Sequence, residues 1–185
     1  MLDVSDRIDY AAAEEREFDR YFDQFFTDLF GLTFRLMGDR GETEDIVQEA
    51  FFRLSTAEVL RRPDGEVGAW LRRVCLNLAT NRLRDGRRAR ERLERAGRLE
   101  VVNASTEYDG PTRSLLRREQ QERVRQVLGD LPDRQRDCLL LRHSGYSYAE
   151  IAETLGIAVG SVGVLLARAE RAFRDLYKEH DHELS

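Results

Sequence analysis

The segment AWLRRVCLNLATNRLRDGRRAR, residues Ala69–Arg90, does most to determine how this chain folds. Its apolar residues recur at spacings of three and four, which is the pattern of a helix that turns one face toward a core. They are Trp70, Leu71, Val74, Cys75, Leu78 and Leu83. The chain has only 3 Pro and no alternating strand-like runs, so the pattern predicts an all-α protein.

The polar surface of this predicted helix is dense in arginine. Residues 61–98 contain 12 Arg and five acidic residues, although the whole chain has a net charge of −5. Arginine donates paired hydrogen bonds to phosphate and keeps its charge, and the amides of Asn77 and Asn81 are suited to base edges. The segment therefore favours a nucleic-acid interface. The alternative is a solvated helix in a chain that prefers Arg and has Lys178 as its only Lys.

Length and composition exclude several classes of protein. The 185 residues allow one domain or two small ones, with no apolar run that could span a bilayer and no signal-peptide pattern. Cys75 and Cys138 have apolar neighbours and no CxxC motif, which favours reduced core cysteines in a cytoplasmic protein. No phosphate loop, nucleophile elbow or carboxylate pair is present, so we expect no enzyme activity, no cofactor and no metal.

The residues before the basic helix predict two further helices. A broad apolar face runs through Phe18–Met37 and ends at Gly38. Asp39 is then a good N-cap, and Glu42 three residues later completes a pattern like a capping box. Residues 55–68 predict a loop. The outer face of the second helix is expected to carry Asp45, Gln48, Glu49 and Phe52.

The second half of the chain is also helical in pattern. Residues 99–112 lose the periodicity and are the best candidate for a linker, the alternative being an ordered loop within one domain. Further on, Ser147 and Glu150 form a capping box that opens a short helix, Gly156 ends it, and another helix follows from about Gly160. This is a helix-turn-helix arrangement, which is common in DNA-binding proteins but arises in other helical proteins too.

Together these segments resemble the sigma-70 family, specifically the short extracytoplasmic-function (ECF) sigma factors. The resemblance covers about residues 18–178. In region 2 it rests on GDRGETEDIVQEAFFRL (Gly38–Leu54) and AWLRRVCLNLATNRLR (Ala69–Arg84), and in region 4 on LPDRQRDCLLLRHSGYSYAEIAETLGIAVGSV (Leu131–Val162) and ARAERAFR (Ala167–Arg174). It implies two small helical domains, region 2 at 1–98 and region 4 at 113–185, joined by a flexible linker at 99–112.

The resemblance also implies a function. A sigma factor directs core RNA polymerase to promoters and helps open the −10 element, while the polymerase performs the catalysis. The implied partners are the β′ clamp helices and the β flap of the polymerase, and promoter DNA, but no membrane. Members of the family are often held inactive by an anti-sigma protein, which makes one a candidate partner here. The surface implied for the β′ clamp helices consists of Asp45, Gln48, Glu49 and Phe52.

The resemblance assigns two DNA-binding surfaces. The −10 element would meet Arg61, Arg62, Trp70, Arg73, Asn77, Asn81, Arg84, Arg87 and Arg88, with Arg72 in the same arginine track. Trp70 is either a wedge between the strands or a core residue. The −35 element would meet Tyr148, Ser161, Val162, Gly163, Arg168 and Arg171.

One departure from the family pattern concerns the −35 element. Gly163 and Leu165 stand where family members commonly carry Lys and Arg, so we expect weaker recognition at −35 than at −10. Two alternative functions remain open at this point. One is a stand-alone helix-turn-helix regulator, which would need neither the DIVQE segment nor the Arg/Asn helix. The other is a sigma-like protein that acts through protein contacts alone.

Overall fold

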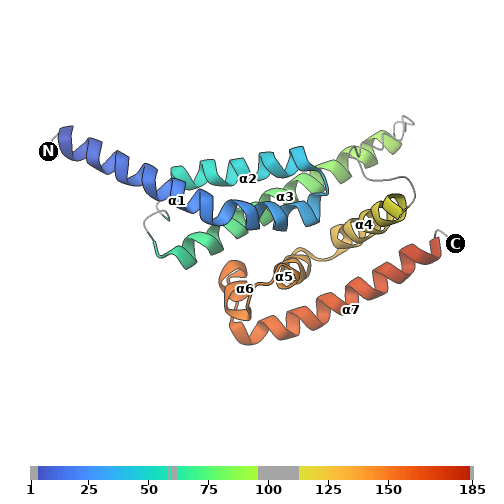
Figure 1. Ribbon diagram of the computed structural model, residues 1–185. Coiled ribbons are helices and arrows are strands. Elements are labelled where there is room, and N and C mark those ends of the chain that lie inside the picture. The colour runs from blue at the N-terminus through green and yellow to red at the C-terminus, as the bar shows by residue number, and fades with distance from the viewer. Residues whose placement is uncertain (1–3, 58, 60–61, 96–112, 184–185) are drawn as a thin grey trace.

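This computed structural model describes residues 4–57, 59, 62–95 and 113–183, and within them it contains seven helices and no strand (Figure 1). The predicted all-α class is confirmed. The predicted linker at 99–112 lies outside the described residues. The helices are α1 (Val4–Met37), α2 (Arg40–Ser55), α3 (Asp64–Arg95), α4 (Arg113–Asp130), α5 (Asp133–His143), α6 (Tyr148–Leu155) and α7 (Val159–Glu183).

Helices α1, α2 and α3 pack together as one layer (Figure 1). Gly38 makes the turn between α1 and α2 with a φ of 71°, a conformation that glycine adopts without a steric penalty. The Asp39 side chain then accepts a hydrogen bond of 2.8 Å from the backbone N–H of Glu42, as the sequence predicts. Helix α1 begins well before the predicted Phe18, because residues 4–17 lack apolar periodicity but are rich in the strong helix formers Ala, Glu and Arg.

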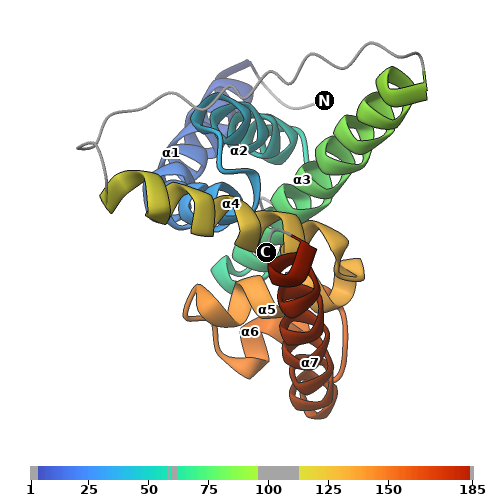
Figure 2. The ribbon, with the colours of Figure 1, turned by 90° about the vertical axis from the view of Figure 1, so that its right-hand side faces the viewer.

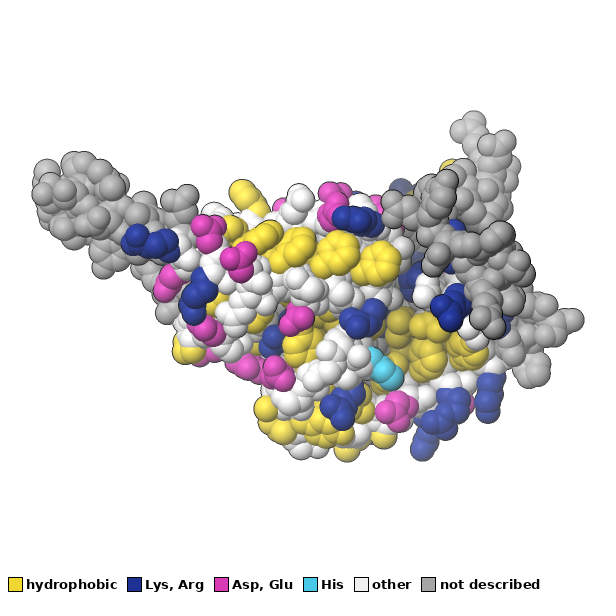
Figure 3. All heavy atoms as spheres, viewed as in Figure 1, with side chains coloured by type: hydrophobic (Ala, Val, Ile, Leu, Met, Phe, Trp, Pro, Cys, Tyr) yellow, Lys and Arg dark blue, Asp and Glu magenta, His cyan; other side chains and the backbone are white. Residues whose placement is uncertain are grey.

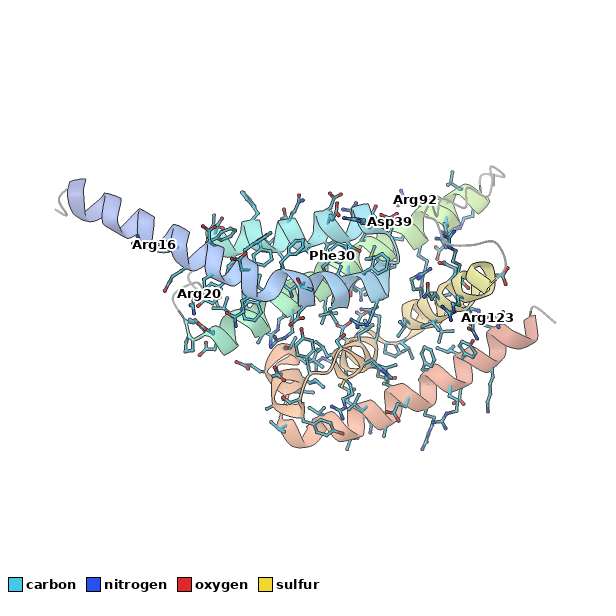
Figure 4. The ribbon with its side chains drawn as sticks, viewed as in Figure 1. Arg16, Arg20, Phe30, Asp39, Arg92 and Arg123 are labelled. Carbon is cyan, nitrogen blue, oxygen red and sulfur yellow. The ribbon has the colours of Figure 1, made fainter. Side chains whose placement is uncertain are left out.

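Helix α3 begins at Asp64, so the predicted loop at 55–68 is too long. The Asp64 carboxylate accepts hydrogen bonds of 2.9 and 3.0 Å from the guanidinium of Arg20 and one of 3.0 Å from the hydroxyl of Tyr21, and these contacts lower its pKa. Figure 4 shows Arg20 reaching from α1 toward the start of α3. A carboxylate in the first turn also interacts favourably with the helix dipole. The contact with α1 therefore supports the start of α3 directly after Pro63, whose carbonyl accepts the first backbone hydrogen bonds of the helix.

Helices α4–α7 form a second layer, with α7 farthest from α1 and α2 (Figure 1). The capping box of α6 is present, since Ser147 and Glu150 exchange backbone and side-chain hydrogen bonds. Gly156 closes α6 in a left-handed conformation with a φ of 63°, and α7 leaves at 90°. The helix-turn-helix predicted from the sequence is therefore observed.

No single helix in the described ranges is long and apolar enough to cross a membrane. Only α6 and α7 taken together, across their 90° bend, reach that length and composition.

Candidate nucleic-acid interface

The outer face of α2 is acidic and carries one exposed aromatic ring. Asp45 and Gln48 are exposed, and Phe52 is 67% exposed. Glu49 is half-buried and pairs with Arg53 at 2.8 Å. The opposite face, with Ile46, Val47 and Ala50, is buried. All four residues predicted for polymerase contact thus share the outer side of one helix, while their role there stays a prediction.

Helix α3 has a buried stripe toward α1 and α2. Leu71 and Cys75 are fully buried, and Trp70, Val74, Leu78 and Leu83 pack against the core. The predicted core face of α3 is confirmed. Trp70 is half-buried within it, which favours the core alternative for this side chain.

A second face of α3, spaced by four residues, is covered by the α4–α7 layer. Its buried members are Arg72, Leu76 and Thr80. Arg84 lies at the edge of this face, where its exposed side chain forms an ion pair with Asp133 at the start of α5. Sequence analysis missed this face, because its partners lie far away in the chain.

Two arginines of α3 bind the carboxyl ends of other helices. Arg73 donates hydrogen bonds of 2.6 and 2.9 Å to the carbonyl oxygens of Thr154 and Glu153 at the end of α6. Arg87 donates one of 2.7 Å to the carbonyl of Gly129 at the end of α4 and pairs with Asp130 at 2.9 Å. Carbonyls at a helix end lack intrahelical partners and carry partial negative charge, so they serve here as acceptors for guanidinium groups.

Arg72 does not belong to a solvent-facing arginine track, and that expectation is wrong. It is only 5% exposed. Its Nε donates a 3.0 Å hydrogen bond to the hydroxyl of Thr154, and its guanidinium lies 4.6 Å from the centre of the Tyr146 ring. The α6 side of the second layer buries this residue, whereas the neighbouring Arg73 keeps an exposed edge.

A strip of α3 beside this covered face remains open to solvent. It contains Asn77, Asn81 and Arg88, all exposed. The last turns of α3 extend beyond the rest of the bundle (Figures 1 and 2). Arg62, just before α3, is exposed and pairs with Glu66 at 3.2 Å. Arg61 lies outside the described residues.

The helix-turn-helix presents most of the residues predicted for −35 contact. Tyr148, Ser161, Arg168 and Arg171 are exposed, and Gly163 is half-buried. Val162 is fully buried in the core between α7 and its neighbours, so its predicted contact with DNA is wrong. Its side chain packs on the inner face of α7.

Comparison with known proteins identifies the family. The family model for "Sigma-70 region 2" matches residues 21–89, and the family model for "Sigma-70, region 4" matches residues 121–173. The chain is 33% identical over 164 residues to the RNA polymerase sigma-H factor of Pseudomonas aeruginosa, covering 86% of this chain and 85% of that protein. It is 28% identical over 167 residues to the ECF RNA polymerase sigma factor SigK of Mycobacterium ulcerans, covering 89% and 88%. The chain belongs to the sigma-70 family, as an ECF sigma factor.

Solved structures share its fold. The chain superposes on the sigma factor RpoE in complex with the anti-sigma factor NepR from Bartonella quintana, with a TM-score of 0.58, 21% identity, and coverage of 88% of this chain and 98% of that one. CnrH in complex with the cytosolic domain of CnrY gives a TM-score of 0.59, 23% identity, and coverage of 94% and 97%. As a sigma factor the protein binds core RNA polymerase and promoter DNA and is not itself an enzyme.

In this sigma factor the junction of α3 and α5 contains a buried polar cluster that sequence analysis missed. Arg136 is 2% exposed; its guanidinium pairs with Asp137 at 3.1 Å and with Asp133 at 3.2 Å, and donates to the hydroxyl of Thr80. Asp133 also holds Arg84. The available signal was a run of charged residues directly before the apolar CLLL of α5.

Burial raises the pKa of Asp137 to about 6 from its ordinary 3.8, against the attraction of Arg136. A raised carboxyl pKa means that the folded state binds the proton more tightly than the unfolded state. The stability this gives is fully present below the ordinary pKa of 3.8 and is lost as the pH rises from there to the folded-state value of about 6. Burial also raises the pKa of the Cys75 thiol to about 12 and that of Cys138 to about 11, so both thiols stay protonated at neutral pH.

We expect Asp137→Asn to stabilise the protein at pH 7.5, because the amide removes a charge whose burial is unfavourable. One unit of pKa shift is worth about 1.4 kcal/mol, and the neighbouring Arg136 loses one of its partners, so the expected gain is about 1–2 kcal/mol in the free energy of unfolding from urea titrations. At about pH 4, where the wild-type carboxyl is protonated in the folded state and largely protonated in the unfolded state, the two proteins should differ much less. Asp85→Asn, an exposed change on α3, is the control. A variant less stable than wild type at pH 7.5 would show that the Arg136–Asp137 ion pair outweighs the cost of burial.

Proposed function

We propose that three surfaces of this sigma factor divide the work of promoter recognition. The outer face of α2 docks on the β′ clamp helices, α3 holds the opened −10 strand, and the helix-turn-helix of α6 and α7 binds the −35 duplex. The observation that carries the proposal is the opposite character of two neighbouring helices in one layer: α2 exposes acids and Phe52, whereas α3 exposes Asn77, Asn81 and a row of arginines.

This proposal includes the division of the chain into region 2 at 1–98, a linker at 99–112 and region 4 at 113–185. The two family matches fall within the first and third of these segments, which supports the division. A cytoplasmic location is part of the same proposal, because a sigma factor must meet core polymerase and promoter DNA. The two buried free thiols are compatible with a reducing compartment.

Replacing Asp45 and Gln48 together by Ala should weaken docking on core polymerase at least tenfold while the fold survives. Both side chains point outward from a helix whose core positions are unchanged, and loss of complementary charge at an interface lowers affinity. Competition against the wild type for core polymerase measures the effect. The matched control, Glu119→Ala with Gln126→Ala, removes an exposed acid and an exposed amide from α4. Equal affinity of the double variant and the control would exclude this face of α2.

Promoter-dependent transcription with core polymerase should separate the roles of two kinds of residue on α3. Asn77→Ala and Asn81→Ala should change which −10 sequences are used, because amides discriminate base edges. Arg88→Ala should weaken all of them evenly and reduce the salt slope by about 0.7, because guanidinium groups mostly meet phosphates. If all three variants affected every −10 sequence equally, the assignment of base reading to the asparagines would be wrong. If neither the wild type nor any variant supported initiation of transcription at any promoter, the chain would act as a regulator or an interaction protein instead.

The contacts between α3 and the second layer compete with DNA. Arg73, Arg84 and Arg87 donate to carbonyls and carboxylates of α4, α5 and α6, and a phosphate needs the same donors. Each of these guanidinium groups has part of its five N–H donors committed to the second layer, which leaves it fewer donors, and a narrower approach, for a phosphate. We therefore propose that the α4–α7 layer moves off α3 before the −10 strand binds there.

Weakening this contact should increase DNA binding by the polymerase-free protein. Asp130→Ala with Asp133→Ala removes the carboxylates that hold Arg87 and Arg84, and the two exposed ion pairs are worth about 1 kcal/mol together. The variant also removes one partner of the buried Arg136, which keeps Asp137 and Thr80. We expect about fivefold tighter binding of a random-sequence single-stranded DNA pool. The control, Asp45→Ala with Glu49→Ala, removes the same charge from α2 and corrects for the general electrostatic gain. If the control tightened binding as much, region 4 would not be masking α3.

An anti-sigma protein is a further proposed partner. The RpoE and CnrH structures are complexes with the anti-sigma factor NepR and with the cytosolic domain of CnrY, respectively. In this chain a hollow of about 1130 Å³ lies between α1, α4, α5 and α7, and Figure 3 shows hydrophobic side chains gathered there between α1 and α7. Its floor includes Phe34, Leu139 and Phe173, and its rim includes Arg174 and Lys178. An amphipathic helix with an acidic face fits this combination.

A further inference from the structure

The outer face of α7 in its first turns is apolar at its centre. Val164 is 56% exposed, and helical spacing places Gly160, Ser161, Ala167 and Arg168 on the same side, all of them exposed. Figure 3 shows hydrophobic side chains at the lower edge of the molecule, where α6 meets the start of α7. This is the face that a helix-turn-helix presents to the major groove.

The packing of the chain itself does not explain this face. A Cβ added at Gly160 would meet no atom within 4 Å, and one at Gly163 would make only an ordinary contact of 3.8 Å with the Tyr148 ring. Glycine lowers helix stability relative to alanine, and valine is a poorer helix former than Arg, Lys, Gln or Glu. Two unneeded glycines beside an exposed valine indicate that something outside the chain selects this surface.

The two glycines leave Val164 standing as a ridge. A hollow of about 620 Å³ on one side is bordered by Gly163, Ala167 and Arg171, and one of about 520 Å³ on the other side by Gly160 and Ser161. Val164 and Arg168 border both hollows. An aliphatic side chain flanked by open space can enter a groove more deeply than a flat helix surface can.

The charge around the ridge favours a polyanion over a second protein. Arg168 and Arg171 lie on the same face one and two turns further along α7, and Arg134 lines one of the hollows. Asp175 is the one acid among the residues bordering them. A purely apolar docking surface would not need this arginine border, whereas a helix in a DNA groove meets phosphates on both sides.

One group on the base edges matches an aliphatic ridge. The major groove displays hydrogen-bond donors and acceptors for every base pair, and its only apolar group is the C5-methyl of thymine. A valine isopropyl group buries that methyl and leaves no donor or acceptor without a partner at that point. Ser161 and Arg168 remain available for neighbouring polar edges.

We propose that Val164, aided by Ala167, is a specificity-determining residue that reads thymine methyl groups in the −35 element. The inference rests on the proposed binding of α7 to the −35 duplex and adds what it recognises there. Shape and methyl contact thereby take the place of the hydrogen-bond donors that family members commonly carry at the positions of Gly163 and Leu165. Leu165 itself packs partly against the core.

The test uses the polymerase holoenzyme and a pool of promoter duplexes randomised over the −35 element. Holoenzyme with wild-type protein should enrich thymine at defined positions of the element. The enriched duplex is then synthesised again with deoxyuridine at those positions, which removes only the methyl groups. We expect binding to fall about fourfold for each contacted methyl, from the free energy of burying one such group.

Two matched variants locate the effect. Val164→Ser should lose the preference for thymine over deoxyuridine. Val159→Ser should keep it, because Val159 is equally exposed at 52% but lies on another side of α7. Both changes are on the surface, where substitutions perturb folding little.

Each outcome decides a different claim. Equal binding of the thymine and deoxyuridine duplexes by wild type overturns methyl reading while leaving −35 binding intact. Loss of the preference in both variants overturns the assignment to Val164. Failure of the wild-type holoenzyme to enrich any −35 sequence overturns the proposed function of α7, and the present inference with it.

Discussion

A guanidinium group that is held near a protein surface needs an acceptor with negative charge, and this constraint organises the whole molecule. Helix α3 concentrates such groups, and in the polymerase-free protein its acceptors come from the chain itself. Arg73 donates to carbonyls at the end of α6, and Arg87 donates to a carbonyl at the end of α4. Arg84 pairs with the carboxylate at the start of α5. Helix ends and phosphates offer arginine the same kind of acceptor. The position of the second layer is therefore set in part by the arginines that are proposed to bind the −10 strand.

The contact between the layers combines strong and weak elements. Arg72 and Arg136 are almost completely buried there, and a buried charge left without its partner is costly. Asp137 works in the opposite direction, because its burial raises its pKa and penalises the charged form at neutral pH. The remaining ion pairs, such as Arg87 with Asp130, have exposed side chains and contribute little each. A contact of this composition holds the two layers together in the polymerase-free protein and can still be opened, which suits a protein whose two halves are proposed to bind separate DNA elements.

The features predicted correctly from the sequence are those fixed by local chemistry. The caps at Asp39 and Ser147, the left-handed end at Gly156 and the inner stripe of α3 each depend on residues within one or two turns. The features missed depend on partners far along the chain. Arg72 and Arg73 are indistinguishable by position and chemistry, and only the approach of Thr154, 82 residues later, buries one of them. Asp64 in the first turn of α3 likewise contacts the distant Arg20, and the burial of Val162 depends on how α7 is rotated against its neighbours.

The two helices proposed to face DNA differ in the kind of interaction energy that they can supply. Helix α3 has arginines in excess, so the contribution expected from it is largely electrostatic, salt-dependent and indifferent to sequence, with discrimination assigned by the proposal to Asn77 and Asn81. Helix α7 has few donors and an aliphatic ridge, so its contribution per contact is smaller and depends on base identity. A weak second site is sufficient when docking on polymerase holds it near its target, because the effective concentration replaces intrinsic affinity. The small number of donors on α7 is then not a deficit. Strong phosphate binding at −35 would slow dissociation from every DNA sequence without improving discrimination between promoters. The proposed contact with methyl groups would add discrimination between promoters and slow dissociation only slightly.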